Sequence, residues 1–392
     1  MTRGLSLGGV GVALVVALAA PGAAAGTGAA PRPEAYRDQP PAAYVSSGGV
    51  VVVDGDGSAA RKLPGTAGAC CPSWSPDGAY LAFQRDRDLW VVEHDGHELH
   101  RVATAVSRWE WAPDGQALAV ISETSRGGID FYGASDPNVR DTELLRYHVR
   151  DFAWAGLGRR VIVSVTAPGS SERAELFMLE VPGPYGSDCP ALCPERPVPI
   201  PIDRPAGRSG PLFAGWSPNV DAIALWSTPD DSATLGLLSP GGGSVVPIAT
   251  TAVRRSWVQW SRLGDRLLVV AGPSGGATPR SLLLCSRLTS CQPITGSDEV
   301  VADPTWSSTG AIAYVRTDRR QLWIAGPDGG GGHAVPAAGD GVAAPHWLPD
   351  AHHVVFVRDA MVWLIDVSGG DATPIGGPLA TGAADQLYSV AP

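Results

Sequence analysis

Three short motifs contain residue types that could support catalysis or metal binding. Gly272–Gly276 reads G-x-S-x-G, the pattern in which serine hydrolases present a nucleophilic serine on a strand-to-helix turn. His94, His97 and His100 follow the spacing H-x2-H-x2-H, and two imidazoles opposed across a two-residue turn can bind zinc or copper. The segment Asp54–Ser58, DGDGS, resembles part of a calcium loop.

Each motif also has a structural interpretation, which we favour. The segment RSLLLC after the serine motif predicts a strand, whereas a nucleophile elbow requires a helix. Strand alternation places His100 on the opposite face from His97. The DGDGS segment lacks the spaced acidic ligands and the terminal glutamate of an EF-hand. The sequence therefore predicts no catalytic residue, no bound metal and no cofactor.

The six cysteines fall into three close pairs: Cys70 and Cys71, Cys189 and Cys193, and Cys285 and Cys291. The third pair stands at the base of a predicted hairpin, where cross-strand neighbours come within disulfide reach. The second pair brackets a short loop in a Pro-rich insertion. We predict a disulfide for each of these two pairs, whereas the adjacent first pair stays open, either as thiols or bonded to other partners.

A tryptophan recurs at the end of a short strand in seven segments, each followed by a tight turn and an apolar strand. Neighbouring copies lie 37 to 46 residues apart, except for one interval of 62 residues. This spacing is typical of the four-stranded blades of a β-propeller. We interpret the rings as filling the space between neighbouring sheets. The recurring residues are Trp74, Trp111, Trp154, Trp216, Trp260, Trp306 and Trp347.

The turns and the termini complete this prediction. In the SPDG turn, proline presets φ at the first corner, and Asp and Gly tolerate the remaining ones. Tyr44–Leu63 predicts the last three strands of a blade, and SVAP near the C-terminus matches a first strand. We predict an all-β chain that forms a single β-propeller of four-stranded blades. The N- and C-terminal strands close it, with eight blades favoured and seven as the alternative.

At Trp74–Gly78 (WSPDG) and Trp111–Gly115 (WAPDG) the sequence resembles the TolB-like propeller repeat, also called the WD40-like PD40 repeat. The resemblance covers residues 42–392 and implies a propeller fold. TolB itself carries an α/β domain before its propeller and works in an envelope complex with a lipoprotein. Residues 26–41 leave no room for such a domain, so we do not expect the translocation role of TolB.

The N-terminus predicts export. Arg3 precedes an apolar run over Leu5–Ala20, and Ala23–Ala25 is a small-residue cleavage site, so residues 1–25 read as a signal peptide. The run is short for a membrane span, although an uncleaved anchor is the alternative. Residues 26–41 are rich in Ala, Pro and Gly and read as a disordered lead-in. We expect a protein of the cell envelope or extracellular space, without a stable membrane span after cleavage.

Charge and insertions bear on partners. The formal net charge of −10 argues against nucleic acid, which requires a basic surface. Two stretches break the repeat, Gly127–Arg150 and Pro182–Pro197. Exposed aromatic and arginine side chains are favoured at interfaces. The candidate contacts for a partner are Phe131, Tyr132, Arg140, Arg146 and Tyr185, and the alternative is a strand pair with a charged loop.

These observations predict a monomeric, exported, non-enzymatic binding module that engages a protein or peptide partner. The alternative is a propeller enzyme, a glycan lyase or hydrolase, with its site in the central channel. That activity would require several acidic, basic or histidine side chains converging near the axis.

Overall fold

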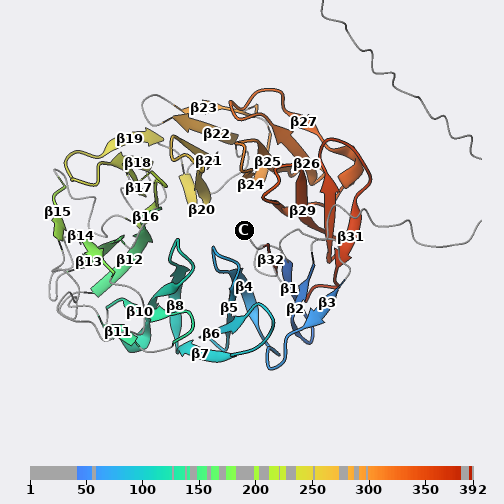
Figure 1. Ribbon diagram of the computed structural model, residues 1–392. Helices are drawn as coiled ribbons and strands as arrows, with labels where there is room; N and C mark the ends of the chain where they lie inside the picture. The colour runs from blue at the N-terminus through green and yellow to red at the C-terminus, as the bar shows by residue number, and fades with distance from the viewer. Residues whose placement is uncertain are drawn as a thin grey trace, which may run out of the picture. The chain divides into compact units, whose positions relative to one another are not determined.

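The computed structural model describes residues 42–54, 59–125, 128–136, 139–141, 148–156, 160–166, 174–181, 198–202, 212–219, 221–226, 235–249, 252–272, 281–286, 291–296, 299–380 and 388–390. Within these ranges the chain forms eight four-stranded antiparallel sheets. Figure 1 shows the sheets arranged one after another around a common centre. The fold is an eight-bladed β-propeller, which confirms the favoured prediction over the seven-bladed alternative.

Blades 1 to 7 each run from the innermost to the outermost strand in chain order. Blade 1 comprises β4 (Cys70–Trp74), β5 (Tyr80–Arg85), β6 (Asp88–Glu93) and β7 (His100–Ala103); blade 2 comprises β8 (Val106–Trp111), β9 (Ala117–Ser122), β10 (Asp130–Gly133) and β11 (Val139–Asp141). Blade 3 comprises β12 (His148–Trp154), β13 (Arg160–Thr166), β14 (Ala174–Glu180) and β15 (Val198–Ile200); blade 4 comprises β16 (Leu212–Trp216), β17 (Ile223–Trp226), β18 (Leu235–Leu238) and β19 (Val246–Ala249). Blade 5 comprises β20 (Ala252–Trp260), β21 (Arg266–Gly272), β22 (Ser281–Ser286) and β23 (Cys291–Pro293). Blade 6 comprises β24 (Val301–Trp306), β25 (Ile312–Arg316), β26 (Gln321–Ala325) and β27 (His333–Ala334); blade 7 comprises β28 (Ala343–Trp347), β29 (His353–Arg358), β30 (Met361–Asp366) and β31 (Thr373–Gly376). Short 3-10 turns cover Glu123–Ser125 and Pro336–Ala338.

The eighth blade joins the two ends of the chain. Its strand order is β3 (Ala60–Lys62), β2 (Gly49–Val53), β1 (Ala42–Ser46) and β32 (Tyr388–Val390). The C-terminal β32 pairs with β1 and takes the innermost position. In Figure 1 β32 accordingly lies toward the middle of the ring. The prediction that terminal strands close the ring is confirmed.

The innermost strands share a bulge. In blades 1 to 7, the pairing of this strand with the next shifts register shortly before the tryptophan. An inserted residue bends a strand and re-aims the side chains that follow it. Three of the bulges hold a non-glycine residue in the left-handed region: Cys71 (φ 59°), Asp303 (φ 51°) and Ala344 (φ 46°). The same irregularity therefore recurs at the same place in blades 1 to 7.

The recurring tryptophans link neighbouring blades. The Trp111 Nε1–H donates to the Ser73 carbonyl oxygen of blade 1 at 3.2 Å, and the Trp306 Nε1–H donates to the Gln259 carbonyl oxygen of blade 5 at 3.3 Å. Four of the seven rings are almost fully buried, with exposed fractions up to 9% for Trp111. The core accordingly consists of clusters that lie between adjacent sheets. These contacts agree with the structural interpretation of the tryptophans.

The turn after the tryptophan is held by its own side chains. In blade 1 the Ser75 hydroxyl donates to Asp77 at 2.6 Å, and the backbone N–H of Tyr80 donates to Ser75 Oγ at 2.9 Å. Gly78 closes the turn with φ 72°, a conformation that favours glycine. The aspartates of the SPDG turns therefore stabilise turns, as the sequence indicated.

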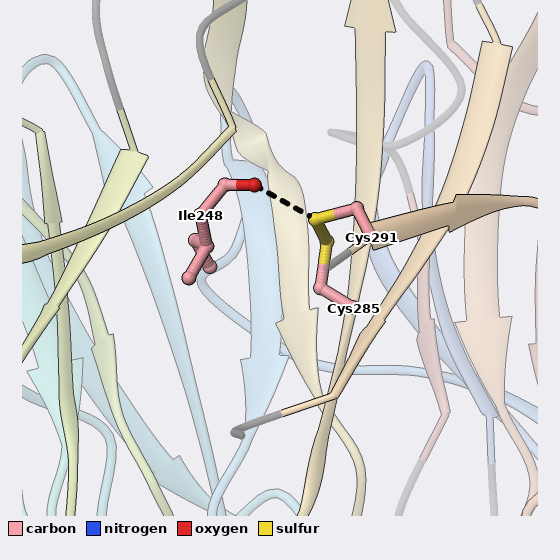
Figure 2. Close-up of a disulfide and its surroundings, with 3 residues drawn as sticks. All are labelled: Ile248, Cys285 and Cys291. Atoms are coloured by element: carbon pink, nitrogen blue, oxygen red, sulfur yellow. Dashed lines mark hydrogen bonds between the residues drawn. A yellow bond between two sulfur atoms is a disulfide. The ribbon is translucent and has the colours of Figure 1, made fainter. Parts of the chain in front are cut away.

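One of the two predicted disulfides lies within the described residues. Cys285 and Cys291 are directly opposed on β22 and β23 and form a disulfide. Figure 2 shows this bond beside blade 4, where the Cys291 sulfur lies 3.1 Å from the Ile248 carbonyl oxygen. This prediction is confirmed, whereas Cys189 and Cys193 lie outside the described residues.

Across the described ranges, no helix has the length and apolar character needed to cross a membrane.

Candidate functional site

A pocket of about 980 Å³ lies where the innermost strands of blades 1 to 4 meet. Its volume is at the upper end of the usual range for small-ligand sites. The wall combines the tryptophans of four consecutive blades with residues that precede or follow them. The lining residues are Ser73, Trp74, Pro76, Arg108, Trp109, Glu110, Trp111, Ala153, Trp154, Gly215 and Trp216.

The tryptophans give the pocket rigid walls. Trp111 is fixed by its bond to blade 1, and Trp154 packs edge-on against Phe131 with ring centroids 5.7 Å apart. The indole N–H groups of Trp154 and Trp216 are buried and meet no acceptor among the described residues. Buried donors of this kind normally have a partner.

Among the described residues that line the pocket, Arg108 is the only cation. Its guanidinium forms ion pairs with Asp151 of β12 and with Glu110, the latter at 2.5 Å. It also donates to the Phe152 carbonyl oxygen at 2.6 Å and lies 4.6 Å from the centroid of that ring. The Asp151 side chain is 1% exposed. Arg108 thus offsets a buried negative charge of the neighbouring blade.

Glu110 has an unusual environment. Burial raises its pKa to about 7; the nearby Asp151 charge acts in the same direction, and Arg108 opposes both. Its side chain nevertheless keeps 42% exposure. Glu110 is thus surrounded by protein on one side and reached by solvent on the other, as expected for a carboxyl group in the wall of an open pocket. Near pH 7, Glu110 can therefore both accept and donate a proton.

The same position of blade 7 carries His346, which also stands one residue before a recurring tryptophan. Desolvation by the surrounding protein lowers the pKa of His346 to about 4, so the imidazole is neutral at physiological pH. Like Glu110, this residue combines contact with solvent and dense protein surroundings. In both blades the residue before the tryptophan is therefore a titratable group whose pKa is shifted by its surroundings.

The charges of the pocket can be added directly. Arg108 contributes one positive charge, Asp151 contributes one negative charge, and Glu110 adds a second negative charge only when it is ionised. With Arg108 and Asp151 charged, the group is neutral when Glu110 is protonated and negative when Glu110 is ionised. Such a site can bind a polar or cationic group and can exchange a proton with it.

No spacing rule in the sequence singled out these three residues, although Arg108 and Glu110 differ from their counterparts in other repeats.

We expect stability to report the titration of Glu110. The unfolded carboxyl ionises near pH 4.5 and the folded one near pH 7, so the folded protein binds more protons in between. Wild-type stability should therefore fall as pH rises through this window, relative to the Glu110→Gln variant. The relative change should be about 1 kcal/mol, less than the full shift implies, because the side chain is partly exposed. Urea unfolding at several pH values measures it.

The control for this prediction is Glu123→Gln, which removes an exposed carboxylate outside the pocket. A difference between Glu110→Gln and wild type that stays flat from pH 4.5 to pH 7.5 would show that Glu110 does not titrate as described.

The structure changes the picture of the predicted partner surface. The expectation that Phe131 and Tyr132 are exposed is wrong, since both lie on β10 and are 3% and 4% exposed. Their strand is the third of blade 2, and Phe131 packs into the core shared with blade 3. Arg140 lies on β11 directly opposite Phe131 in register. Arg146 and Tyr185 lie outside the described residues.

Of the other motifs, the histidine motif includes a turn, whereas residues 55–58 of the DGDGS segment lie outside the described residues. His94, Asp95 and Gly96 form the turn after β6, and the His97 N–H donates to Asp95 at 2.9 Å. The described residues contain no group of three or more His, Cys, Asp or Glu side chains placed to hold a metal ion. Gly272 ends β21, and the remainder of the serine motif lies outside the described residues.

No family model matches the sequence, and no curated protein matches it. Similarity is found among solved structures. NirN, the dihydro-heme d1 dehydrogenase in complex with DHE, is 14% identical with a TM-score of 0.56, and the match covers 89% of this chain and 76% of that one. A prolyl endopeptidase is 16% identical with a TM-score of 0.52, and the match covers 78% of this chain and 48% of that one. A eukaryotic initiation factor is 12% identical with a TM-score of 0.51, and the match covers 86% of this chain and 96% of that one.

At these identities the likeness supports the propeller fold alone. The named proteins include enzymes and an initiation factor, so one architecture serves unrelated activities. Function has to be argued from the pocket.

Proposed function

We propose that the protein is an exported, non-enzymatic binding module, a TolB-like propeller that engages a protein or peptide partner. The pocket framed by four tryptophans and the Arg108–Glu110 pair is the observation that carries this proposal. Tryptophan and arginine dominate the energetic centres of protein interfaces, and a rigid wall reduces the entropy lost on binding. We propose that a polar or cationic side chain of the partner enters this pocket.

Other features support the proposal. The N-terminal segment reads as a signal peptide, and a disulfide suits an exported protein. The insertion at 182–197 remains a second proposed contact, because insertions in repeat proteins fall in loops that often bind partners.

A crosslinking pull-down from the native host, with the mature protein as bait, tests this function. Trp109 lines the pocket and is half-buried, and Trp90 is equally half-buried but lies outside the pocket wall. We expect Trp109→Ala to weaken capture of the partner by at least about tenfold. The matched variant Trp90→Ala should retain capture. Equal capture by both variants would place the partner away from the pocket.

The insertion is tested separately by deletion of residues 183–195. If it contributes to the interface, we expect partner capture to fall by about tenfold while the unfolding midpoint of the propeller stays unchanged. Unchanged capture by this variant would remove the insertion from the proposed surface and leave the pocket as the binding site.

The second candidate function is an enzyme that acts on glycans in the channel. It is favoured by one observation: Glu110 has a pKa of about 7 and lies beside Arg108, which suits general acid or base catalysis. A glycan hydrolase and lyase screen distinguishes the candidates. Turnover that is lost in Glu110→Gln would favour the enzyme, whereas capture of a partner without turnover favours the binding module.

A further inference from the structure

Two adjacent cysteines stand at the start of the innermost strand of blade 1. Cys70 and Cys71 are the first residues of β4, and both are half-buried, so reagents in solution can reach them. Ser73 and Trp74, later in the same strand, belong to the pocket wall. The cysteine pair therefore lies in the strand that supplies one side of the candidate site.

The bulge in β4 brings the two sulfur atoms together. Neighbouring side chains of a regular strand point to opposite faces, which separates them. Here the pairing with β5 shifts between Cys70 and Ser73, and Cys71 adopts φ 59°. The sulfur atoms consequently approach to 2.7 Å. This distance is well inside the roughly 3.5–4.0 Å typical of non-bonded heavy atoms and approaches the roughly 2.05 Å of a disulfide.

The fold provides this geometry without the cysteines. The corresponding positions of blades 6 and 7, Asp303 and Ala344, adopt the same left-handed conformation at the same bulge. In blade 6 the Asp303 side chain accepts the Ala344 backbone N–H at 3.0 Å, a structural contact between blades. Blade 1 places two thiols at this feature. The two sulfur atoms are therefore close for two reasons: the bulge recurs in the propeller repeat, and in blade 1 both residues at the bulge are cysteines.

We propose that Cys70 and Cys71 form a reversible vicinal disulfide, which makes the start of β4 a redox-sensitive site. The oxidant is a disulfide compound, either a small molecule or a protein. One cysteine thiolate attacks that disulfide, breaks its S–S bond and releases one thiolate. The second cysteine thiolate then attacks the mixed disulfide, forms the Cys70–Cys71 bond and releases the other thiolate. Two electrons pass to the oxidant, and the two protons of the cysteines pass to its thiolates.

The two disulfides of blades 1 and 5 should then differ in their ease of reduction. A bond between sequence neighbours closes a small ring through one peptide unit, and departures from ordinary disulfide geometry make a bond more reducible. Strained and accessible disulfides are the labile ones. Cys285 is 1% exposed and its bond joins paired strands, so it serves as an internal structural reference. This inference does not depend on the identity of the partner.

Thiol labelling at controlled redox ratios tests the proposal. The full mature chain is equilibrated with graded ratios of oxidised to reduced glutathione, alkylated, digested with trypsin and analysed by mass spectrometry. Cleavage after Lys62 and Arg85 puts both cysteines on one peptide, 63–85, whereas Arg287 separates Cys285 from Cys291. At oxidising ratios we expect peptide 63–85 to lack two hydrogens and to take no label. At reducing ratios that leave the Cys285–Cys291 linkage intact, it should take two labels.

Two variants provide the controls. Cys71→Ser cannot close the ring, so Cys70 should carry one label or one glutathione at every ratio. The double variant Cys285→Ser, Cys291→Ser should leave the titration of peptide 63–85 unchanged. The proposal is overturned if the wild-type peptide takes two labels even at the most oxidising ratios. It is equally overturned if peptide 63–85 is found linked to another peptide of the chain, or if it opens only together with the Cys285–Cys291 bond.

Discussion

Replacement of Arg108 by methionine is expected to destabilise the protein by about 3–5 kcal/mol. The guanidinium bridges Asp151, whose side chain is 1% exposed, and Glu110 in the pocket. Methionine preserves much of the aliphatic volume but leaves the Asp151 carboxylate buried without its arginine. Removal of one partner of a buried ion pair is costly, whereas the net stabilisation by the intact pair is small. The decrease in the free energy of unfolding therefore measures the cost of burying the Asp151 carboxylate without its arginine. Urea unfolding at pH 7 detects this decrease.

A surface pair provides the matched control. Arg87 and Glu123 also form an ion pair, at 2.6 Å, but their side chains are 62% and 64% exposed. Water solvates either partner when the other is removed, so Arg87→Met should leave the unfolding midpoint within experimental error. Equal effects of the two arginine variants would mean that Asp151 is hydrated in the folded protein.

A double variant separates charge from packing. Asp151→Asn keeps the shape of the side chain and removes its charge, so combining it with Arg108→Met should recover part of the stability lost by Arg108→Met alone. If the double variant is as unstable as the single one, the loss stems from the packing of Arg108 on Phe152, where its guanidinium lies 4.6 Å from the ring centroid.

Most of the fold was predictable because it repeats. Seven tryptophan segments of similar spacing, each followed by a turn with Pro, Asp or Gly, specify blades through local chemistry. The closing strand was predictable because SVAP resembles the first strands of the complete blades. The disulfide between Cys285 and Cys291 followed from hairpin register. In each case the signal resides in residues close together in the sequence.

The candidate site was not predictable by the same route. Arg108, Glu110 and Asp151 come from two blades, just after the bulge of each innermost strand, and meet across the boundary between the blades. Such bulges depend on backbone angles that no residue type reveals, as Cys71 and Ala344 show by sharing one conformation. The misplacement of Phe131 and Tyr132 has a related cause. An irregular sequence stretch suggested a loop, whereas its aromatic residues form a buried strand of blade 2.

Removal of residues 385–392 is expected to destabilise the propeller by roughly 2–4 kcal/mol. The truncation deletes β32 and with it the pairing of Ala42, Ala43 and Tyr44 to the C-terminus. The edge of β1, which carries the buried Tyr44, then loses its strand partner. An opened ring also presents a strand edge that can pair with another molecule. We expect a lower urea midpoint together with concentration-dependent association in analytical ultracentrifugation.

The remainder of the chain isolates the role of β32. The segment before the truncation stays anchored, because the Ala380 N–H donates to the Val45 carbonyl oxygen at 2.7 Å and the Leu379 N–H donates to the Ala360 carbonyl oxygen at 2.8 Å. The shorter deletion of residues 391–392, which follow β32, serves as the control and should leave both measurements unchanged. If the long and short truncations behave alike, β32 contributes little to closure, and the blade is held by β1, β2 and β3 alone. If only the long truncation lowers the urea midpoint, the pairing of β32 with β1 closes the ring. This is the result we expect, because β32 is the last strand in the sequence and the innermost strand of the blade begun by β1, β2 and β3.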